Sequence, residues 1–152
     1  MADYYSMFSV MIETKVKEER EWLIAQTKAL TNAYEEANPD GLSEEIIAVL
    51  TEQGVTVEEV YPPECDLDER GLWLRNDESC GHEFAAYIAQ AYLRKFKPDG
   101  CFGIEVSHSC SKPRLDAFGG SACFITADGV EWHGTGRWLD EKRAGHDERE
   151  NK

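Results

Sequence analysis

A thiol and two cations lie close together in the sequence, within residues 109–120. Cys110 stands two residues before Lys112 and four before Arg114. Neighbouring positive charges favour the thiolate form of a cysteine, and the thiolate is the nucleophile in thiol chemistry. The same cations would attract an anionic substrate. The segment is therefore a candidate site for a thiol-dependent enzyme or for a small anionic ligand.

A nucleophilic cysteine also needs a general base and an oxyanion site. His108 is the nearest candidate base, but side chains two residues apart on an extended chain are separated by about 7 Å. Alternatively, Pro113, Gly119 and Gly120 shape an ordered loop whose two cations balance the acidity of the rest of the chain. We favour this structural interpretation, and among the functional ones we favour ligand binding over catalysis.

Neither a metal site nor a redox motif is signalled. The chain has five cysteines and no CxxC pair. Two short pairs, Cys80 with His82 and His108 with Cys110, do not make a four-ligand set. Residues 66–69 resemble the start of a calcium loop but lack its glycine and closing glutamate. We therefore expect free thiols, no metal and no cofactor.

The acidity of the chain is concentrated in one third of its length. Thirty Asp and Glu residues against 16 Lys and Arg residues give a formal net charge of −14. Residues 35–83 contain fifteen acids and two bases, so this stretch has a net charge of −13 and the remainder −1. Such a field repels nucleic acid and anionic membranes and attracts basic proteins. An acidic face can therefore take the place of DNA in a groove built to receive it.

We expect the acids of residues 44–69 to form such a face. A helix that starts at Ser43 and a strand at 55–61 each have an apolar side to bury, which directs their carboxylates outward, and a charged loop follows at 64–70. The alternative is that the carboxylates only keep the protein in solution. The candidate partner-binding residues are Glu44, Glu45, Glu52, Glu58, Glu59, Glu64, Asp66, Asp68 and Glu69.

The segment around Cys110 belongs to a longer pattern. Its runs are Cys110-Ser111-Lys112-Pro113-Arg114, Phe118-Gly119-Gly120 and Ile125-Thr126-Ala127, with Trp132 and Trp138 downstream. In this pattern the chain resembles a family of small acidic proteins of unknown function that occur in bacteria and in their phages or plasmids. The resemblance covers mainly residues 71–139. It implies a similar fold, but no activity, cofactor or catalytic residue.

Hydrophobic periodicity predicts the elements that must position these residues. Alternation predicts strands at 4–13, 55–61, 71–75, 101–108, 122–126 and 130–133, and helical spacing predicts helices at 15–37, 43–54, 79–96 and 137–144. Asp128-Gly129 signals a type I′ hairpin turn. We expect the four tryptophans to anchor the core, with Trp138 and Leu139 holding the last helix. We also expect Cys101 and Cys123 to be buried, and the polar tail 146–152 to be frayed.

The order β-α-α-β-β-α-β-β-β-α lacks the strict alternation of a parallel sheet. We therefore predict one α+β domain over residues 1–145, with a mostly antiparallel sheet and helices packed on one face. No apolar run approaches the roughly 18 residues of a membrane span, and no export signal is visible, so we expect a cytoplasmic protein.

The leading functional hypothesis is a non-enzymatic interaction protein that binds a basic, nucleic-acid-handling partner. Its concrete form is a DNA-mimic inhibitor of a bacterial defence system. Two alternatives stay open. One is an enzyme or ligand-binding protein that uses residues 109–120, and the other is a structural protein whose acidity serves only solubility.

Overall fold

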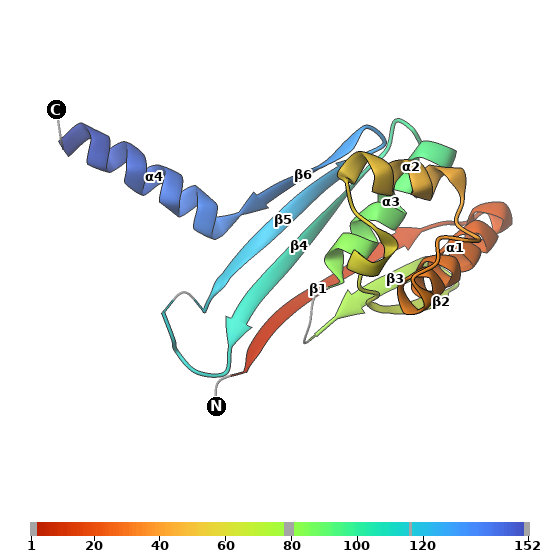
Figure 1. Cartoon of the computed structure of the whole chain (residues 1–152), viewed down its shortest axis with the longest axis horizontal. Coiled ribbons are helices and arrows are strands. Elements are labelled where there is room, and N and C mark those ends of the chain that lie inside the picture. The colour runs from red at the N-terminus through yellow and green to blue at the C-terminus, as the bar shows by residue number, and fades with distance from the viewer. Residues whose placement is uncertain (1–2, 78–80, 116, 151–152) are drawn as a thin grey trace.

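A computed structural model describes residues 3–77, 81–115 and 117–150. In this part of the chain, antiparallel strands form one six-stranded sheet in the order β2-β3-β1-β4-β5-β6, accompanied by four α-helices and one short 3₁₀ helix (Figure 1). The predicted α+β class and order of elements are confirmed. The strands are β1 (Tyr4–Glu13), β2 (Glu64–Asp68), β3 (Gly71–Asn76), β4 (Cys101–Cys110), β5 (Gly119–Thr126) and β6 (Gly129–Gly134). The helices are α1 (Lys17–Glu36), α2 (Glu44–Gln53), η1 (Val57–Glu59), α3 (His82–Phe96) and α4 (Thr135–Glu150).

The first strand lies inside the sheet, as its apolar character on both sides predicts. It pairs with β3 along one edge and with β4 along the other. Because side chains alternate along a strand, every second residue of β1, β3, β4 and β5 points to one face of the sheet. This face holds the buried side chains Phe8, Ile12, Leu72, Leu74, Ile104, Val106, Cys123 and Ile125.

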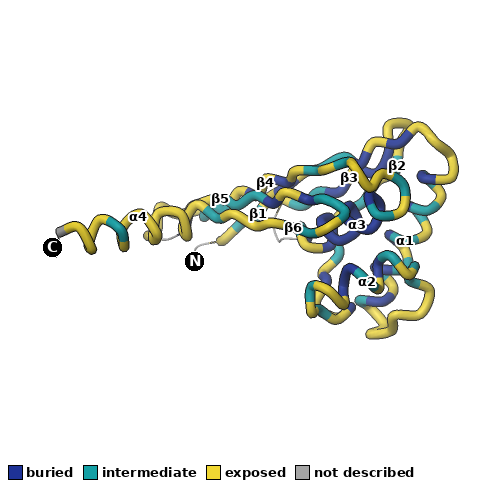
Figure 2. Tube along the Cα trace, turned by 90° about the horizontal axis from the view of Figure 1, so that it is seen from above, coloured by how far each residue is buried: buried dark blue, intermediate teal, exposed yellow. Residues whose placement is uncertain are grey.

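Helices α1, α2 and α3 lie on the side of the sheet that carries this core. Ten consecutive residues of α3, from Phe84 to Leu93, are buried, because the helix lies between the sheet and the other two helices. Helix α2 packs on α3 and stands farther from the sheet (Figure 2). It starts and ends as predicted: Ser43 Oγ accepts a hydrogen bond from the Ile46 N–H, and Gly54 closes the helix with a φ of 69°.

Helix α4 departs from the predicted packing. It projects from the end of β6, contacts mainly β5 and β6, and is exposed along most of its length (Figures 1 and 2). Trp138 and Leu139 are 48% and 43% exposed, so the expectation that they anchor this helix in the core is wrong. The helix also continues through residues 146–150, which the sequence pattern assigned to a frayed tail. Glu148 and Arg149 are good helix formers within this extension, whereas Gly145, His146 and Asp147 are not.

The predictions for residues 55–70 are wrong in their local detail. Residues 57–59 form η1, not a strand, because Val57 and Val60 are buried three residues apart, which is the period of a 3₁₀ helix. The strand lies instead at β2, in the stretch that was expected to be a charged loop. There Cys65 and Leu67 turn toward the helices, and the alternating acids turn away from them.

The β5–β6 hairpin is confirmed, but its turn is not of type I′. Thr126 pairs with Gly129, so the turn residues are Ala127 and Asp128. Neither has the positive φ that a type I′ turn requires at both central positions.

The expected burial of tryptophans and cysteines holds only in part. Cys123 is buried, whereas Cys101 is exposed at the start of β4. Trp22 is half-buried, and Trp73 and Trp132 are 36% and 41% exposed. The two strand tryptophans are therefore not core anchors.

Candidate functional site

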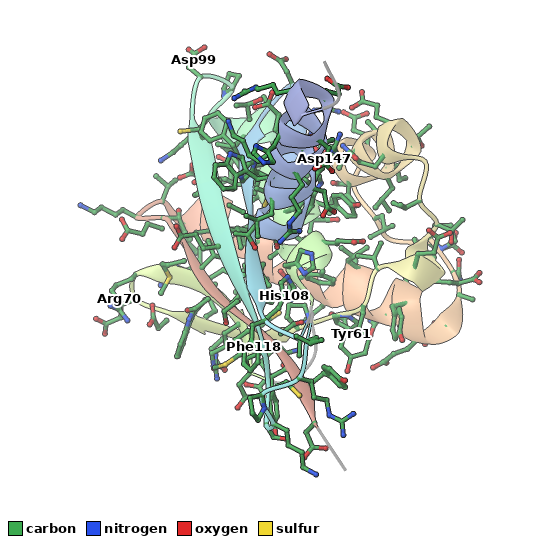
Figure 3. All side chains as sticks on the ribbon, turned by 90° about the vertical axis from the view of Figure 1, so that its left-hand side faces the viewer. Tyr61, Arg70, Asp99, His108, Phe118 and Asp147 are labelled. Carbon is green, nitrogen blue, oxygen red and sulfur yellow. The ribbon has the colours of Figure 1, made fainter. Side chains whose placement is uncertain are left out.

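The predicted partner-binding carboxylates fall into two separate groups. Eight of the nine are exposed, and Glu45 is half-buried. Five come from α2 and η1 on the helical side, and four come from β2 and the turn after it at the edge of the sheet. Tyr61 and Arg70, which adjoin the two groups, lie on opposite sides of Figure 3. The expected single face is therefore divided.

The acids of β2 are largely matched by arginines. Arg75 Nη1 lies 2.6 Å from an Asp66 oxygen, and its Nε lies 3.6 Å from a Glu64 oxygen. Arg70 pairs with Asp68 at 3.5 Å, and the Arg70 backbone N–H lowers the pKa of this carboxyl below its ordinary value. Exposed pairs of this kind add little to stability, but they reduce the local net charge.

The acids on the helical side include several that form no ion pair with a described cation. Glu45 pairs with Lys95, and Glu52 with Arg94, but Glu44, Glu58 and Glu59 are in no ion pair within the described residues. Three more exposed carboxylates, to which no cation of the described residues is paired, lie at the end of α1 and in the loop before α2. We refer to this set as the helical acidic surface: Glu35, Glu36, Asp40, Glu44, Glu58 and Glu59.

A contact between two aromatic rings joins the end of α1 to the segment after η1, so the carboxylates of these two segments lie on neighbouring parts of the molecule. Tyr34 near the end of α1 makes an edge-to-face contact with Tyr61, with ring centroids 5.7 Å apart, and α1 also packs on η1. Tyr61 and Ile47 remain 48% and 46% exposed. The connections on both sides of α2 are exposed as well (Figure 2). The same segments therefore carry both exposed carboxylates and accessible apolar side chains of the kind that anchor interfaces.

A small hollow of about 180 Å³ adjoins this surface. It is lined by Glu59, Tyr61, Gly81, His82 and Glu83. Burial lowers the pKa of His82 below its ordinary value, although the charge of Glu83 opposes this shift. A neutral imidazole adds no positive charge beside the two carboxylates. The hollow can therefore accept the cationic end of a lysine or arginine side chain.

The alternative site around Cys110 is spread out. Strand β4 extends to Cys110 and β5 begins at Gly119, so the connecting loop is shorter than predicted. Cys110 is half-buried, while Lys112 and Arg114 are exposed. The backbone before and after Cys110 is held to the start of β1, where the Ser111 N–H donates to the Asp3 carbonyl at 2.8 Å.

His108 faces two serines, not the thiol. Its Nδ1 lies 2.9 Å from Ser6 Oγ on β1, and its Nε2 lies 3.4 Å from Ser121 Oγ on β5. Both ring nitrogens are thus engaged, and His108 is not placed to act as the base for Cys110. A hollow of about 430 Å³ adjoins this cluster. Sequence reasoning missed it because only the strand register brings Ser6 and Ser121 to His108.

The described cysteines are free thiols: Cys65, Cys101, Cys110 and Cys123. Cys80 lies outside the described residues. Burial raises the pKa of Cys65 and of Cys123 to about 11, which keeps both protonated at neutral pH. In the described ranges, no three His, Cys, Asp or Glu side chains gather as a metal site would require.

No helix among the described residues is long and apolar enough to cross a membrane. Comparison with known proteins returned no match to a protein-family model, a curated protein or a solved structure.

Proposed function

We propose that this chain is a non-enzymatic binding protein that engages a basic, nucleic-acid-handling protein through the helical acidic surface. The observation that carries this proposal is the group of exposed carboxylates without a described cationic partner on the same segments as the exposed side chains of Tyr61 and Ile47. Charge complementarity would supply a fast and selective encounter. The apolar side chains would supply most of the affinity, as buried anchors do in other interfaces.

The concrete form of the proposal is mimicry of DNA. A duplex presents one negative charge for about every 1.7 Å of its axis, and proteins receive it in grooves lined by lysine and arginine. Carboxylates at the end of α1, in the following loop, on α2 and on η1 would occupy such a groove and exclude DNA. The inhibited protein would be a nuclease or a related component of a bacterial defence system.

A second candidate function is binding of a small ligand at the hollow beside His108. The observation in its favour is the cross-strand Ser6–His108–Ser121 cluster, whose polar groups line a hollow of about 430 Å³ together with Tyr4 and Phe118. A thiol-dependent enzyme is less favoured, because neither ring nitrogen of His108 is directed to Cys110.

The test of the proposed function is capture of bacterial proteins on the immobilised chain, followed by elution with excess duplex DNA. We compare the natural chain with a Glu58→Lys, Glu59→Lys variant. The matched control is Asp147→Lys, Glu148→Lys, which makes the same change in charge at adjacent exposed acids on α4. The retained proteins are identified by mass spectrometry.

We expect the natural chain to capture nucleic-acid-binding proteins and to release them when DNA is added. The control variant should capture the same proteins, and the Glu58 and Glu59 variant should not. Lys112→Ala and Arg114→Ala should leave this capture unchanged. If the loop changes abolish capture while the Glu58 and Glu59 reversals are silent, the binding site lies at the loop and the mimicry proposal is wrong. Capture that DNA cannot reverse would also contradict it.

A further inference from the structure

The face of the sheet opposite α1, α2 and α3 carries exposed apolar side chains. In the part of the chain that the structure describes, these three helices all lie on the other face (Figures 1 and 2). Met7 on β1 and Phe124 on β5 point to this open face and are 45% and 49% exposed. An antiparallel sheet commonly leaves one face to solvent, but apolar side chains on that face favour burial against another layer.

The open face is hollowed over β4, β5 and β6. Two adjoining depressions of about 710 and 500 Å³ share Glu105, Ala122 and His133 in their lining. Small residues form the floor, among them Gly103, where an added Cβ would meet no atom within 4 Å. Together the two depressions make one shallow groove, which we call the open-face groove.

Helix α4 has one side that matches an acidic, partly apolar groove. At 100° per residue, Trp138, Lys142 and Arg149 share a stripe, and Leu139 and Arg143 lie on the adjacent stripe. Trp138 and Leu139 are 48% and 43% exposed, and Lys142 Nζ lies 5.6 Å from the Trp138 ring centroid. The opposite side of the helix carries most of its acids, which are Asp140, Glu141, Asp147 and Glu148.

The charges of the groove and of this helix side are complementary and similarly spaced. Within the described residues, Glu105 and Glu131 form no ion pair, and Lys142 and Arg149 pair with no carboxylate. The register places Glu131 two strands and two residues away from Glu105, which is about 12 Å. Lys142 and Arg149 are separated by about 10 Å of helix rise.

We propose that the open-face groove is occupied by α4 of a second copy of this chain. Each copy has one groove and one such helix, so a two-fold axis would exchange the helices and form both contacts at once. Trp138 and Leu139 would cover Phe124, which pairs with Glu131 in the sheet. An isolated helix of this length is marginal in water, so docking would also stabilise α4.

The second copy is favoured over the chain's own helix by the geometry of the junction. The Gly120 N–H donates to Thr135 Oγ1 at 3.0 Å, at the point where α4 begins. From there α4 projects away from the sheet, continuing beyond β6 (Figure 1). Reaching its own groove would require the helix to reverse direction at residues 134–136.

The first test measures the oligomeric state of the full chain by sedimentation velocity across a range of concentrations. We expect a dimer. Trp138→Ala with Leu139→Ala should weaken the dimer at least tenfold. Leu115→Ala, which removes an apolar side chain that is 95% exposed elsewhere, should not change it. A chain that stays monomeric at all concentrations overturns the proposal.

The second test exchanges the charges. Glu105→Lys with Glu131→Lys, or Lys142→Glu with Arg149→Glu, should each weaken the dimer at least tenfold. The variant with all four changes should recover most of the lost affinity. Asp147→Lys on the opposite side of α4 is the control and should have little effect.

Other occupants of the groove give different results. A monomer in which groove reversal removes hydrogen-exchange protection from α4 indicates docking within one chain and contradicts the proposal. A dimer that responds to Glu58→Lys and Glu59→Lys but not to the groove reversal places α4 on the helical acidic surface and also contradicts it. The dimer is independent of partner binding, so failure of either proposal leaves the other standing.

Discussion

Glu19 is a buried carboxylate whose two oxygens have different partners. The Tyr92 hydroxyl donates to Oε1 at 3.0 Å, and Thr14 Oγ1 donates to Oε2 at 3.2 Å. The three residues join the end of β1 to α1 and α3 in the core. A buried carboxylate needs such donors, because an unsatisfied charged group in the interior is costly.

We therefore expect Tyr92→Phe to destabilise the protein by about 1–3 kcal/mol, because the buried Glu19 carboxyl group would lose one of its two hydrogen-bond donors. Urea unfolding followed by circular dichroism measures the change. Tyr4→Phe is the control: Tyr4 is 63% exposed, and removal of its hydroxyl should cost less than about 0.5 kcal/mol. Equal effects of the two changes would show that the Glu19 contact contributes nothing.

The buried thiols should be much less reactive than the exposed Cys101. Burial raises the pKa of Cys123 to about 11, so at pH 8 about one molecule in a thousand carries the thiolate, against roughly one in four for an ordinary thiol. Alkylation of the folded protein, mapped by peptide mass spectrometry, should label Cys101 at least 100-fold faster than Cys123. Denaturation should equalise the two rates. Equal rates in the folded protein would contradict the burial of Cys123.

The raised pKa of the buried thiols also predicts how the free energy of unfolding changes with pH. Because the folded Cys65 and Cys123 bind their protons more tightly than the unfolded chain does, their contribution to stability is fully present below about pH 9. It is lost as the pH rises toward about 11. Tyr92, whose pKa burial raises to about 12, acts in the same direction at higher pH.

At the scale of elements, periodicity predicted the parts of the fold that bury one clear face. The strand at 4–13, the helix capped by Ser43 and the helix ending at Phe96 all have apolar side chains at the expected spacing, and the structure confirms them. The prediction for residues 55–70 was wrong because two sequence signals were ambiguous. Val55 and Val57 imitate a strand, while the acids of β2 conceal the alternation of Cys65 and Leu67.

The sequence predicted less of the candidate site than of the fold. The outward direction of Glu44 and Glu52 could be predicted, since the helix that Ser43 caps has an apolar side to bury. The division of the acids into two groups could not, because it depends on the placement of β2 beside β3 at the far edge of the sheet. The pairing of Glu64 and Asp66 with Arg75 depends on that register as well.

The junction of β2 and β3 should depend on Gly71. Its φ is +143°, and a Cβ at this position would lie 2.0 Å from the Ile12 carbonyl oxygen on β1. We expect Gly71→Ala to cost about 3 kcal/mol or more, because the backbone cannot move away without breaking the β1–β3 pairing. Gly129→Ala, where an added Cβ meets nothing within 4 Å, should change thermal stability little. Similar melting temperatures for the two variants would contradict the close approach of Gly71 to β1.

At the scale of the whole molecule, charge is distributed unevenly over the fold. Residues 35–83 have a net charge of −13, and the structure places much of it on the outer side of the helical layer. The unpaired members of the helical acidic surface repel one another, which opposes folding. This repulsion is expected for acids that are grouped to bind a partner. Acids that serve only solubility could be dispersed over the surface, where they would repel one another less.

This repulsion can be measured through its salt dependence. Glu58→Gln with Glu59→Gln removes two charges and leaves an amide oxygen to accept the Thr56 hydrogen bond that Glu59 now accepts. At 10 mM salt, where the screening length is about 30 Å, we expect the melting temperature to rise by about 1–3 °C. At 0.5 M salt the gain should nearly vanish. The control, Glu45→Gln with Glu52→Gln, breaks the ion pairs with Lys95 and Arg94 and should lower the melting temperature at low salt. If both variants shift it in the same direction, the two sets of carboxylates do not differ, and the helical acidic surface is not a site of uncompensated charge.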